Sequence, residues 1–255
     1  MKILIKISFD GSDFSGFQYQ PGEKTVQGTL TEAACRLFGE GTRVTGCSRT
    51  DAGVHALGFC ATLEPPEGAR GPETAKIPAA LNFYLPDSVS ALAAREVPDG
   101  FHPRYSVVDK TYKYLISPSH IRMPLLEGRV YRPPRDLGPD EVAAMDAAAR
   151  TLEGRHDFSS YMASGSKITD TVRNMKRASV AVENGLVAVT LTADGFLYNM
   201  VRIVSGTLLE AGLRLSDPSA VRAVTEALDR SAAGPTLPPY ALYLCSVNHG
   251  EEYSF

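Results

Sequence analysis

The order of strand-like and helix-like segments is the feature of this sequence that most limits its fold. Residues 2–9 alternate apolar and polar side chains, which predicts a half-buried strand. Residues 26–38 carry apolar side chains at helical spacing, and strand-like segments 43–47 and 54–63 follow with no helix between them. This order favours an α+β fold over alternating strand–helix repeats.

A second series of elements follows residue 104. Strands are predicted over 105–117, 173–182, 186–193 and 241–247, and helices over 140–152, 196–213 and 218–229. The sequence Glu183-Asn184-Gly185 lies between two of these strands and predicts a hairpin. The sequence therefore predicts two α+β domains, an N-terminal one over 1–104 and a C-terminal one over 105–255.

The charge of the chain is nearly balanced, but its basic residues are grouped. The chain has 26 Lys and Arg against 29 Asp and Glu, a formal net charge of −3, so it is no bulk polycation. Residues 101–135 hold seven basic and two acidic residues, and residues 167–177 hold four and one. A solvated charged face is the usual reason for such segments, yet two of them in an acidic chain favour a polyanionic partner.

Cysteine and hydropathy patterns exclude several other classes of protein. The four cysteines, at positions 35, 47, 60 and 245, form no C-x-x-C pair and have no histidine at zinc-finger spacing. No metal site and no dense disulfide framework are therefore expected. No stretch approaches the ~20 apolar residues of a membrane span, and the apolar start is too short for a secretory signal. We expect a soluble, reduced, cytoplasmic protein without a membrane partner.

The densest polar cluster of the sequence is the segment 48–55, SRTDAGVH, between two strand-like segments. Loops fixed by rigid strands are common places for functional side chains, and here they include Arg49, Asp51 and His55. Asp51 and Gly53 also have the residue types of an ordinary turn. The residues of this loop alone favour the ordinary turn.

The segment 110–114, KTYKY, has the period of a strand. Lys110, Tyr112 and Tyr114 are therefore expected on one face, with Thr111 and Lys113 on the other. Tyrosines between lysines suit a surface on which bases stack and phosphates bind. A half-buried strand with amphipathic side chains has the same pattern and is the simpler interpretation.

Arg202 lies in the predicted helix 196–213. At 100° per residue it lies about 140° from Leu197 around the helix axis, well away from the apolar stripe. Its side chain is therefore expected to face solvent or a cleft.

Several motifs together indicate a family. They are FDG at 9–11, GFQYQ at 16–20, TVQG at 25–28, RTDAGVHA at 49–56, FHPR at 101–104, KTYKY at 110–114, GRHDF at 154–158, MVR at 200–202 and ALYL at 241–244. With these motifs in this order, the chain resembles the TruA family of tRNA pseudouridine synthases from end to end. Phe17 stands where that family often has Trp.

The resemblance implies roles for particular residues. It implies that Asp51 is a nucleophile, that Tyr112 contacts the substrate and that Arg202 is the partner of the aspartate. Arg49 and His55, beside Asp51, are expected to bind substrate.

The resemblance also implies a fold, a substrate and an assembly. It implies two ferredoxin-like (RNP-like) halves, with antiparallel sheets flanking a basic active-site cleft. The substrates would be uridines 38, 39 and 40 in the anticodon stem-loop of tRNA, the protein would be a homodimer, and no cofactor would be needed.

The residues suit this chemistry. Conversion of uridine to pseudouridine breaks the N1–C1′ bond and rejoins the base through C5, with no net oxidation or hydrolysis. A carboxylate nucleophile divides such a reaction into easier steps, and a nearby arginine favours its ionised form. The base must leave its stack, and an aromatic ring such as that of Tyr112 can pack against it. The sequence leaves open whether Asp51 attacks C1′ or C6.

Two other functions are compatible with parts of the sequence. One is a catalytically silent tRNA-binding protein of the same fold, which has no need of a nucleophile at Asp51. The other is a nucleoside hydrolase or glycosidase, which usually needs a second acid opposite the first. The loop around Asp51 offers Arg49 and His55 instead.

Overall fold

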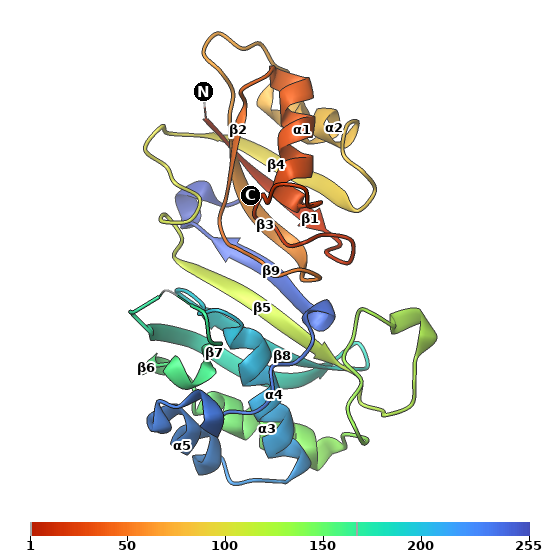
Figure 1. The fold of residues 1–255 in the computed structure, drawn as a ribbon, viewed down its shortest axis with the longest axis vertical. Coiled ribbons are helices and arrows are strands. Elements are labelled where there is room, and N and C mark those ends of the chain that lie inside the picture. The colour runs from red at the N-terminus through yellow and green to blue at the C-terminus, as the bar shows by residue number, and fades with distance from the viewer. Residues whose placement is uncertain (1, 167) are drawn as a thin grey trace. The chain divides into compact units, whose positions relative to one another are not determined.

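The structure is a computed structural model that describes residues 2–166 and 168–255, and these form two compact units (Figure 1). The first unit holds the chain up to Val108 together with Tyr243–Phe255, and the second holds Asp109–Leu242. The chain leaves the first unit close to the predicted boundary at residue 104. Its last segment returns to the first unit, whereas the sequence prediction had grouped it with the second.

The first unit is built on a mostly antiparallel sheet. Its strands are β1 (Lys2–Phe9), β2 (Arg43–Gly46), β3 (His55–Glu64), β4 (Val89–Val97) and β9 (Leu242–Asn248). Strand β1 lies between β4 and β3 and is antiparallel to both. Strand β3 also pairs with β2, antiparallel, and with β9, parallel. Strand β3 is therefore central, and the segment that precedes it is anchored on both sides.

Two helices pack against one face of this sheet (Figure 1). They are α1 (Val26–Phe38) and α2 (Ile77–Asn82). Helix α1 has the predicted bounds: the Thr25 hydroxyl accepts a hydrogen bond from the Gly28 amide at 3.2 Å, and Gly39, at φ 104°, ends the helix. The core lies between the helices and the side chains of Ile3, Ile5 and Ile7, which are fully buried.

The strands of the second unit are antiparallel to one another. Its strands are β5 (Asp109–Ile116), β6 (Gly154–Asp157), β7 (Val172–Glu183) and β8 (Leu186–Ala193), in the order β5–β8–β7–β6. Strands β7 and β8 form the predicted hairpin. Asn184 and Gly185 connect them with φ of 50° and 78°, the pair of positive values that a tight two-residue hairpin turn requires.

Three helices complete the second unit: α3 (Pro139–Arg150), α4 (Met200–Leu213) and α5 (Ser219–Ala227). Helix α4 is buried on nearly all sides and contacts both others. It begins four residues after the predicted start at residue 196, because Asn199 has a left-handed backbone, φ 60°, that a helix cannot include.

The remaining regular structure is a set of short 3-10 turns, at Thr74–Lys76, Pro124–Leu126, Ser159–Tyr161, Arg230–Ala232, Pro239–Ala241 and Glu251–Tyr253. The mixture of helices with mostly antiparallel strands confirms the α+β class. Among the helices that the structure describes, none has both the length and the apolar character needed to cross a membrane.

Candidate active site

The loop that carries Asp51 connects β2 to β3 in the first unit. The pairing of these strands continues one residue beyond β2, where the Cys47 amide donates to the Cys60 carbonyl at 2.9 Å. The loop then turns, with the Val54 amide donating to the Asp51 carbonyl at 3.2 Å. Asp51 is half-buried and Arg49 is exposed. The carboxylate therefore lies on a short loop between two fixed strand ends.

A second segment, residues 10–17, packs against this loop, and we call it the cradle. The Phe17 amide donates to the Thr50 carbonyl at 3.2 Å, and the Gly53 amide donates to the Phe14 carbonyl at 3.4 Å. The two bonds lie on either side of Asp51 in the sequence. The cradle thus fixes the backbone of the aspartate from both directions.

Two glycines allow the cradle to approach so closely. A Cβ atom at Gly16 would lie 2.5 Å from the Thr50 carbonyl oxygen, and Gly16 also has φ +88°. A Cβ atom at Gly11 would lie 2.0 Å from the Val54 carbonyl oxygen. Any side chain at either position would push the cradle away from the Asp51 loop. Sequence reasoning singled out these glycines only as parts of motifs and did not foresee their contact with the loop.

Phe17, the last residue of the cradle, packs against the strands on both sides of the Asp51 loop. Its ring stacks on Phe59 of β3, with centroids 4.2 Å apart and planes at 23°. A Cβ atom at Gly46, the last residue of β2, would lie 2.2 Å from the Phe17 ring. The ring therefore fills the space over the strands that lead into and out of the loop.

His55, at the start of β3, is 2% exposed and connects three segments. Its Nδ1 lies 3.1 Å from the Gly11 amide nitrogen and 3.1 Å from Asp10 Oδ1. A deprotonated Nδ1 accepts from the Gly11 amide, and a protonated Nδ1 donates to Asp10. The ring also stacks on Tyr243 of β9, with centroids 4.8 Å apart. His55 thus holds the cradle to the sheet; its contact with substrate stays a prediction.

Tyr112 lies on β5 in the second unit, opposite Leu191 of β8. The side chain is 6% exposed and meets Phe196 edge to face, with centroids 5.0 Å apart and planes at 79°. Tyr114, two residues on, is fully buried on the same face. Thr111 and Lys113 are half-buried, in agreement with the predicted alternation of faces.

Tyr114 lies close enough to Arg202 to be affected by its charge. Its hydroxyl donates to the Pro238 carbonyl at 2.8 Å. Burial raises the pKa of Tyr114 far above its usual value, the hydroxyls of Tyr240 and Tyr131 raise it further, and the positive charge of Arg202 opposes the rise. The positive charge of Arg202 therefore acts on a buried tyrosine of β5, the strand that also carries Tyr112.

Arg202 lies in the first turn of α4 and is half-buried. Its Nε donates to the Leu237 carbonyl at 2.7 Å, and its Nη1 donates to Asn199 Oδ1 at 2.6 Å. A cation at the N-terminus of a helix opposes the helix dipole, so this position does not stabilise α4. The two hydrogen bonds instead fix the direction of the guanidinium group.

The five predicted site residues thus fall into two sets. Arg49, Asp51 and His55 lie together on and beside one loop of the first unit, and Tyr112 and Arg202 belong to the second unit. The pairing of Asp51 with Arg202 stays a prediction. Among the described residues, no group of three or more His, Cys, Asp or Glu side chains is arranged to hold a metal ion.

Ion pairs neutralise part of the positive charge of the two predicted basic segments. Lys113 pairs with Glu183, Arg135 with Glu141, and Lys176 with Asp109. Arg122, Arg129, Arg132 and Arg177 are exposed. Lys167, counted in the second segment, lies outside the described residues.

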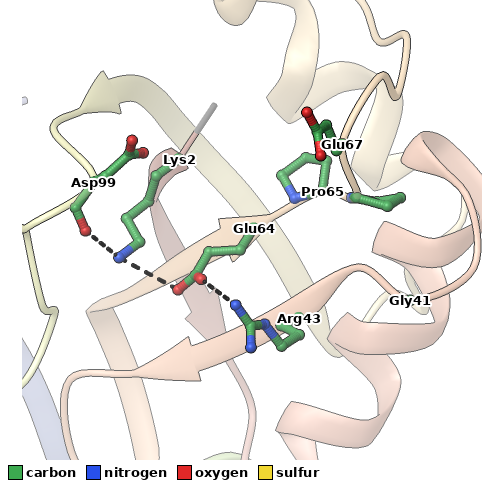
Figure 2. A pocket seen from close by; sticks show the side chains of 8 residues that line it. Lys2, Gly41, Arg43, Glu64, Pro65, Glu67 and Asp99 are labelled. Atoms are coloured by element: carbon green, nitrogen blue, oxygen red, sulfur yellow. Dashed lines mark hydrogen bonds and ion pairs between the residues drawn. The ribbon is translucent and has the colours of Figure 1, made fainter.

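A separate hollow of about 540 Å³ lies in the first unit (Figure 2). Three of its charged side chains bind one another: Lys2 Nζ lies 3.4 Å from Glu64, and Arg43 Nη2 lies 3.1 Å from Glu64. Lys2 also donates to the main-chain carbonyl of Asp99 at 2.8 Å. None of the predicted site residues lines this hollow. Its internal pairing makes it a structural feature of the sheet end.

Comparison with known proteins decides the family. A model of the tRNA pseudouridine synthase family matches residues 5–106 and 148–249. The chain belongs to this family. It is 42% identical over 245 residues to the tRNA pseudouridine synthase A of Caldicellulosiruptor bescii, and 40% identical over 245 residues to that of Caldicellulosiruptor saccharolyticus. Each alignment covers 96% of this chain and 98% of the relative.

A third relative is similar along nearly its whole length. The chain is 38% identical over 252 residues to the tRNA pseudouridine synthase A of Geobacillus kaustophilus, covering 98% of this chain and 95% of that one. The two segments that match the family model include the Asp51 loop, the cradle, His55 and Arg202 but not Tyr112. The resemblance drawn from the motifs is therefore confirmed.

Proposed function

We propose that this protein isomerises uridine to pseudouridine at positions 38, 39 and 40 in the anticodon stem-loop of tRNA, with Asp51 as the nucleophile. Membership of the tRNA pseudouridine synthase family establishes the reaction, the isomerisation of uridine to pseudouridine. The observation that carries the assignment to Asp51 is its loop, which presents a half-buried carboxylate between two strands and under a glycine cradle. A nucleophile needs such fixed placement, because small displacements of a reacting group cost large factors in rate.

The reaction needs one group to hold the separated pieces of the nucleotide. The N1–C1′ bond breaks, the uracil turns, and a C5–C1′ bond forms; C5 then loses its proton and N1 gains one. Asp51 forms a temporary covalent bond to the nucleotide and is released at the end, so the carboxylate is regenerated. The electrons balance within the uridine, and the proposed mechanism therefore uses no cofactor.

The other site residues support this nucleophile. Arg202, fixed by Leu237 and Asn199, would stabilise the ionised carboxylate. Tyr112, supported by Phe196, would pack against the base once it has left its stack. Arg49, exposed two residues before Asp51, would bind a phosphate of the same substrate. His55 would assist binding by keeping the loop and cradle together.

We further propose that both units are ferredoxin-like and that the protein is a cytoplasmic homodimer. In the first unit the elements follow the order β1-α1-β2-β3-α2-β4, with the strands arranged β4–β1–β3–β2, which is the ferredoxin-like pattern. In the second unit β5, α3, β7, β8 and α4 follow the same order, with the strands arranged β5–β8–β7. The dimer and the cleft flanked by the sheets rest on the family resemblance.

The test uses tRNA transcripts labelled with tritium at C5 of a single uridine at position 38, 39 or 40. The protein should release tritium to water from each transcript. Asp51→Asn should abolish release while tRNA affinity stays within several-fold of the original, since phosphate contacts dominate affinity.

The matched control is Asp13→Asn. Asp13 is an exposed carboxylate in the cradle, and its substitution should leave the rate unchanged. Turnover near the original rate in Asp51→Asn would remove Asp51 from the mechanism. A silent tRNA-binding protein would release no tritium from any transcript, and a hydrolase would release free uracil.

A further inference from the structure

Residues 196–199, which we call the entry segment, lead into α4 and touch both of the predicted site residues of the second unit. The ring of Phe196 meets Tyr112 edge to face, with centroids 5.0 Å apart. Asn199 Oδ1 accepts a hydrogen bond from Arg202 Nη1 at 2.6 Å. Tyr112 and Arg202 belong to different elements, β5 and α4. The entry segment therefore connects the two residues.

The backbone of the entry segment is itself fixed. The Ala163 amide donates to the Tyr198 carbonyl at 3.1 Å, and the Met200 amide donates to the Leu197 carbonyl at 3.1 Å. The side chain of Leu197 is buried. A segment held in this way can keep its side chains within the small tolerance that a reacting site needs.

Asn199 has an unusual backbone for the residue that precedes a helix. Its φ of 60° and ψ of 7° lie in the left-handed region. The preceding residue is usually extended, which lets its side chain accept a hydrogen bond from a first-turn amide. In the part of the chain that the structure describes, Asn199 accepts no such bond. A strained backbone persists where its surroundings impose it, commonly at functional sites. The contacts of Asn199 are therefore expected to serve something other than the helix end.

The side chain of Asn199 serves Arg202 instead of the amides of α4. Its amide oxygen is an acceptor, and a hydrogen bond from a guanidinium group is stronger than one between neutral groups. Glycine would adopt the left-handed backbone with less strain but has no acceptor. Asparagine is one of the few residues that combine an acceptor with tolerance of this region. The position thus requires both properties of asparagine.

We propose that Asn199 is a positioning residue, and that the entry segment holds Arg202 and Tyr112 in place together. Asn199 acts through Arg202 rather than on the uridine itself. Loss of its acceptor leaves the guanidinium group free to turn away from the direction that the reaction uses. The rate should then suffer more than tRNA affinity, because phosphate contacts dominate affinity. The proposal rests on the roles of Arg202 and Tyr112 proposed above.

The first variant is Asn199→Gly, which removes the acceptor and keeps the left-handed turn. Single-turnover tritium release at saturating tRNA should fall about 10- to 100-fold, as expected for a reacting group displaced by about 1 Å. The Kd for tRNA should stay within several-fold of the original. The midpoint of urea unfolding should stay close to the original, because relief of backbone strain offsets the lost hydrogen bond.

A conservative variant and a matched control separate positioning from turn formation. Asn199→Asp keeps the acceptor and should retain most of the rate. Asn184→Gly is the control, because Asn184 also has a left-handed backbone, with φ 50°, but lies exposed in the hairpin between β7 and β8. It should change neither rate nor affinity. If Asn199 served only the turn, Asn199→Gly would keep the full rate, and this result would overturn the proposal.

A double-variant cycle tests whether the entry segment acts as one element. Phe196→Leu removes the edge-to-face contact with Tyr112 and should lower the saturating rate. Combined with Asn199→Gly, it should cost less than the product of the two separate losses, because both act through the same segment. A full rate in Phe196→Leu, or a combined loss equal to that product, would show that Tyr112 and Arg202 are held independently.

The order of the Arg202 side chain is measured separately, by nuclear magnetic resonance of its guanidinium group. Distinct Nη signals in the original protein should merge in Asn199→Gly, because the bond to Nη1 no longer restricts rotation. This readout decides whether Asn199 fixes Arg202 even if the original protein releases no tritium, a result that would contradict the proposed function alone. Normal tritium release with unchanged Arg202 signals in Asn199→Gly would contradict the positioning role alone.

Discussion

The backbone on either side of Asp51 is fixed by main-chain hydrogen bonds, so substitutions at glycines that pack against it test its placement. The carbonyl of Thr50 accepts from Phe17, and Gly16 packs directly against it. The cradle makes these contacts with main-chain atoms. They can form only because Gly16 has no side chain. Gly16, which has no side chain, therefore controls the placement of the loop that carries the proposed nucleophile.

Gly16→Ala should lower turnover more than its effect on folding explains. The new Cβ would lie 2.5 Å from the Thr50 carbonyl, so the cradle or the Asp51 loop must move, and the φ of +88° adds about 1–2 kcal/mol of strain. Gly22→Ala is the matched control, because Gly22 has a similar φ of +80° but nothing within 4 Å of the new Cβ. Urea unfolding and single-turnover rates are measured for both. Equal rates in the two variants would show that the cradle does not position Asp51.

Helix α4 connects the packing of the second unit to Arg202. A Cβ atom at Gly206 would lie 2.0 Å from the Pro235 carbonyl oxygen, so the segment after α5 runs directly against the helix. The same segment supplies the Leu237 carbonyl that accepts from Arg202 Nε. The Gly234 amide also donates to Thr207 Oγ1 at 2.9 Å. The direction of the guanidinium group thus depends on how closely this segment packs on α4.

Gly206→Ala should displace that segment and loosen Arg202. Overpacking of this kind costs about 1–3 kcal/mol in the free energy of unfolding, and we expect turnover to fall as well while tRNA affinity persists. Gly100→Ala, where nothing lies within 4 Å of the new Cβ, is the control and should change neither. Denaturation, tRNA binding and tritium release are measured on the same preparations. A destabilised Gly206→Ala variant with full turnover at saturating tRNA would contradict the link between this segment and the site.

The elements whose bounds the sequence predicted best have both a regular spacing of apolar side chains and residues that mark their two ends. Helix α1 has both, with Thr25 and Gly39 at its ends. The predicted strand 105–117 starts at Asp109 instead, because residues before it turn, with the Ser106 amide donating to the His102 carbonyl. The contact of Gly16 with Thr50 joins two turn-rich segments distant in sequence, and such a contact leaves no periodic pattern. The cradle therefore could not be predicted, although its motif could be recognised.

At the scale of the whole molecule, the two units differ in how they bury tyrosine. In the second unit Tyr112, Tyr114 and Tyr161 are buried, whereas the buried aromatic residues of the first unit are phenylalanines and histidines such as Phe17 and His55. Burial raises the pKa of Tyr161 to about 12, and it raises that of Tyr114 further. Unfolding lets both hydroxyls ionise at their ordinary pKa of 10.0.

The second unit should therefore lose stability in alkali through its buried tyrosines, whereas the first unit has its own alkaline group, Cys60, because burial raises the pKa of that thiol far above its ordinary 9.0. Above pH 10 unfolding lets Tyr161 release a proton that the folded unit keeps, so the contribution of Tyr161 to stability is full below pH 10 and falls as the pH rises toward 12. For Tyr161 the loss is about 2–3 kcal/mol, at 1.36 kcal/mol for each unit between the two pKa values. Hydrogen exchange as a function of pH, followed separately in each unit, measures it. Tyr161→Phe should be less stable at neutral pH, since it loses the bond to Thr225, yet less sensitive to alkali. An unchanged slope of the stability of the second unit with pH in Tyr161→Phe would show that other groups govern its unfolding at high pH.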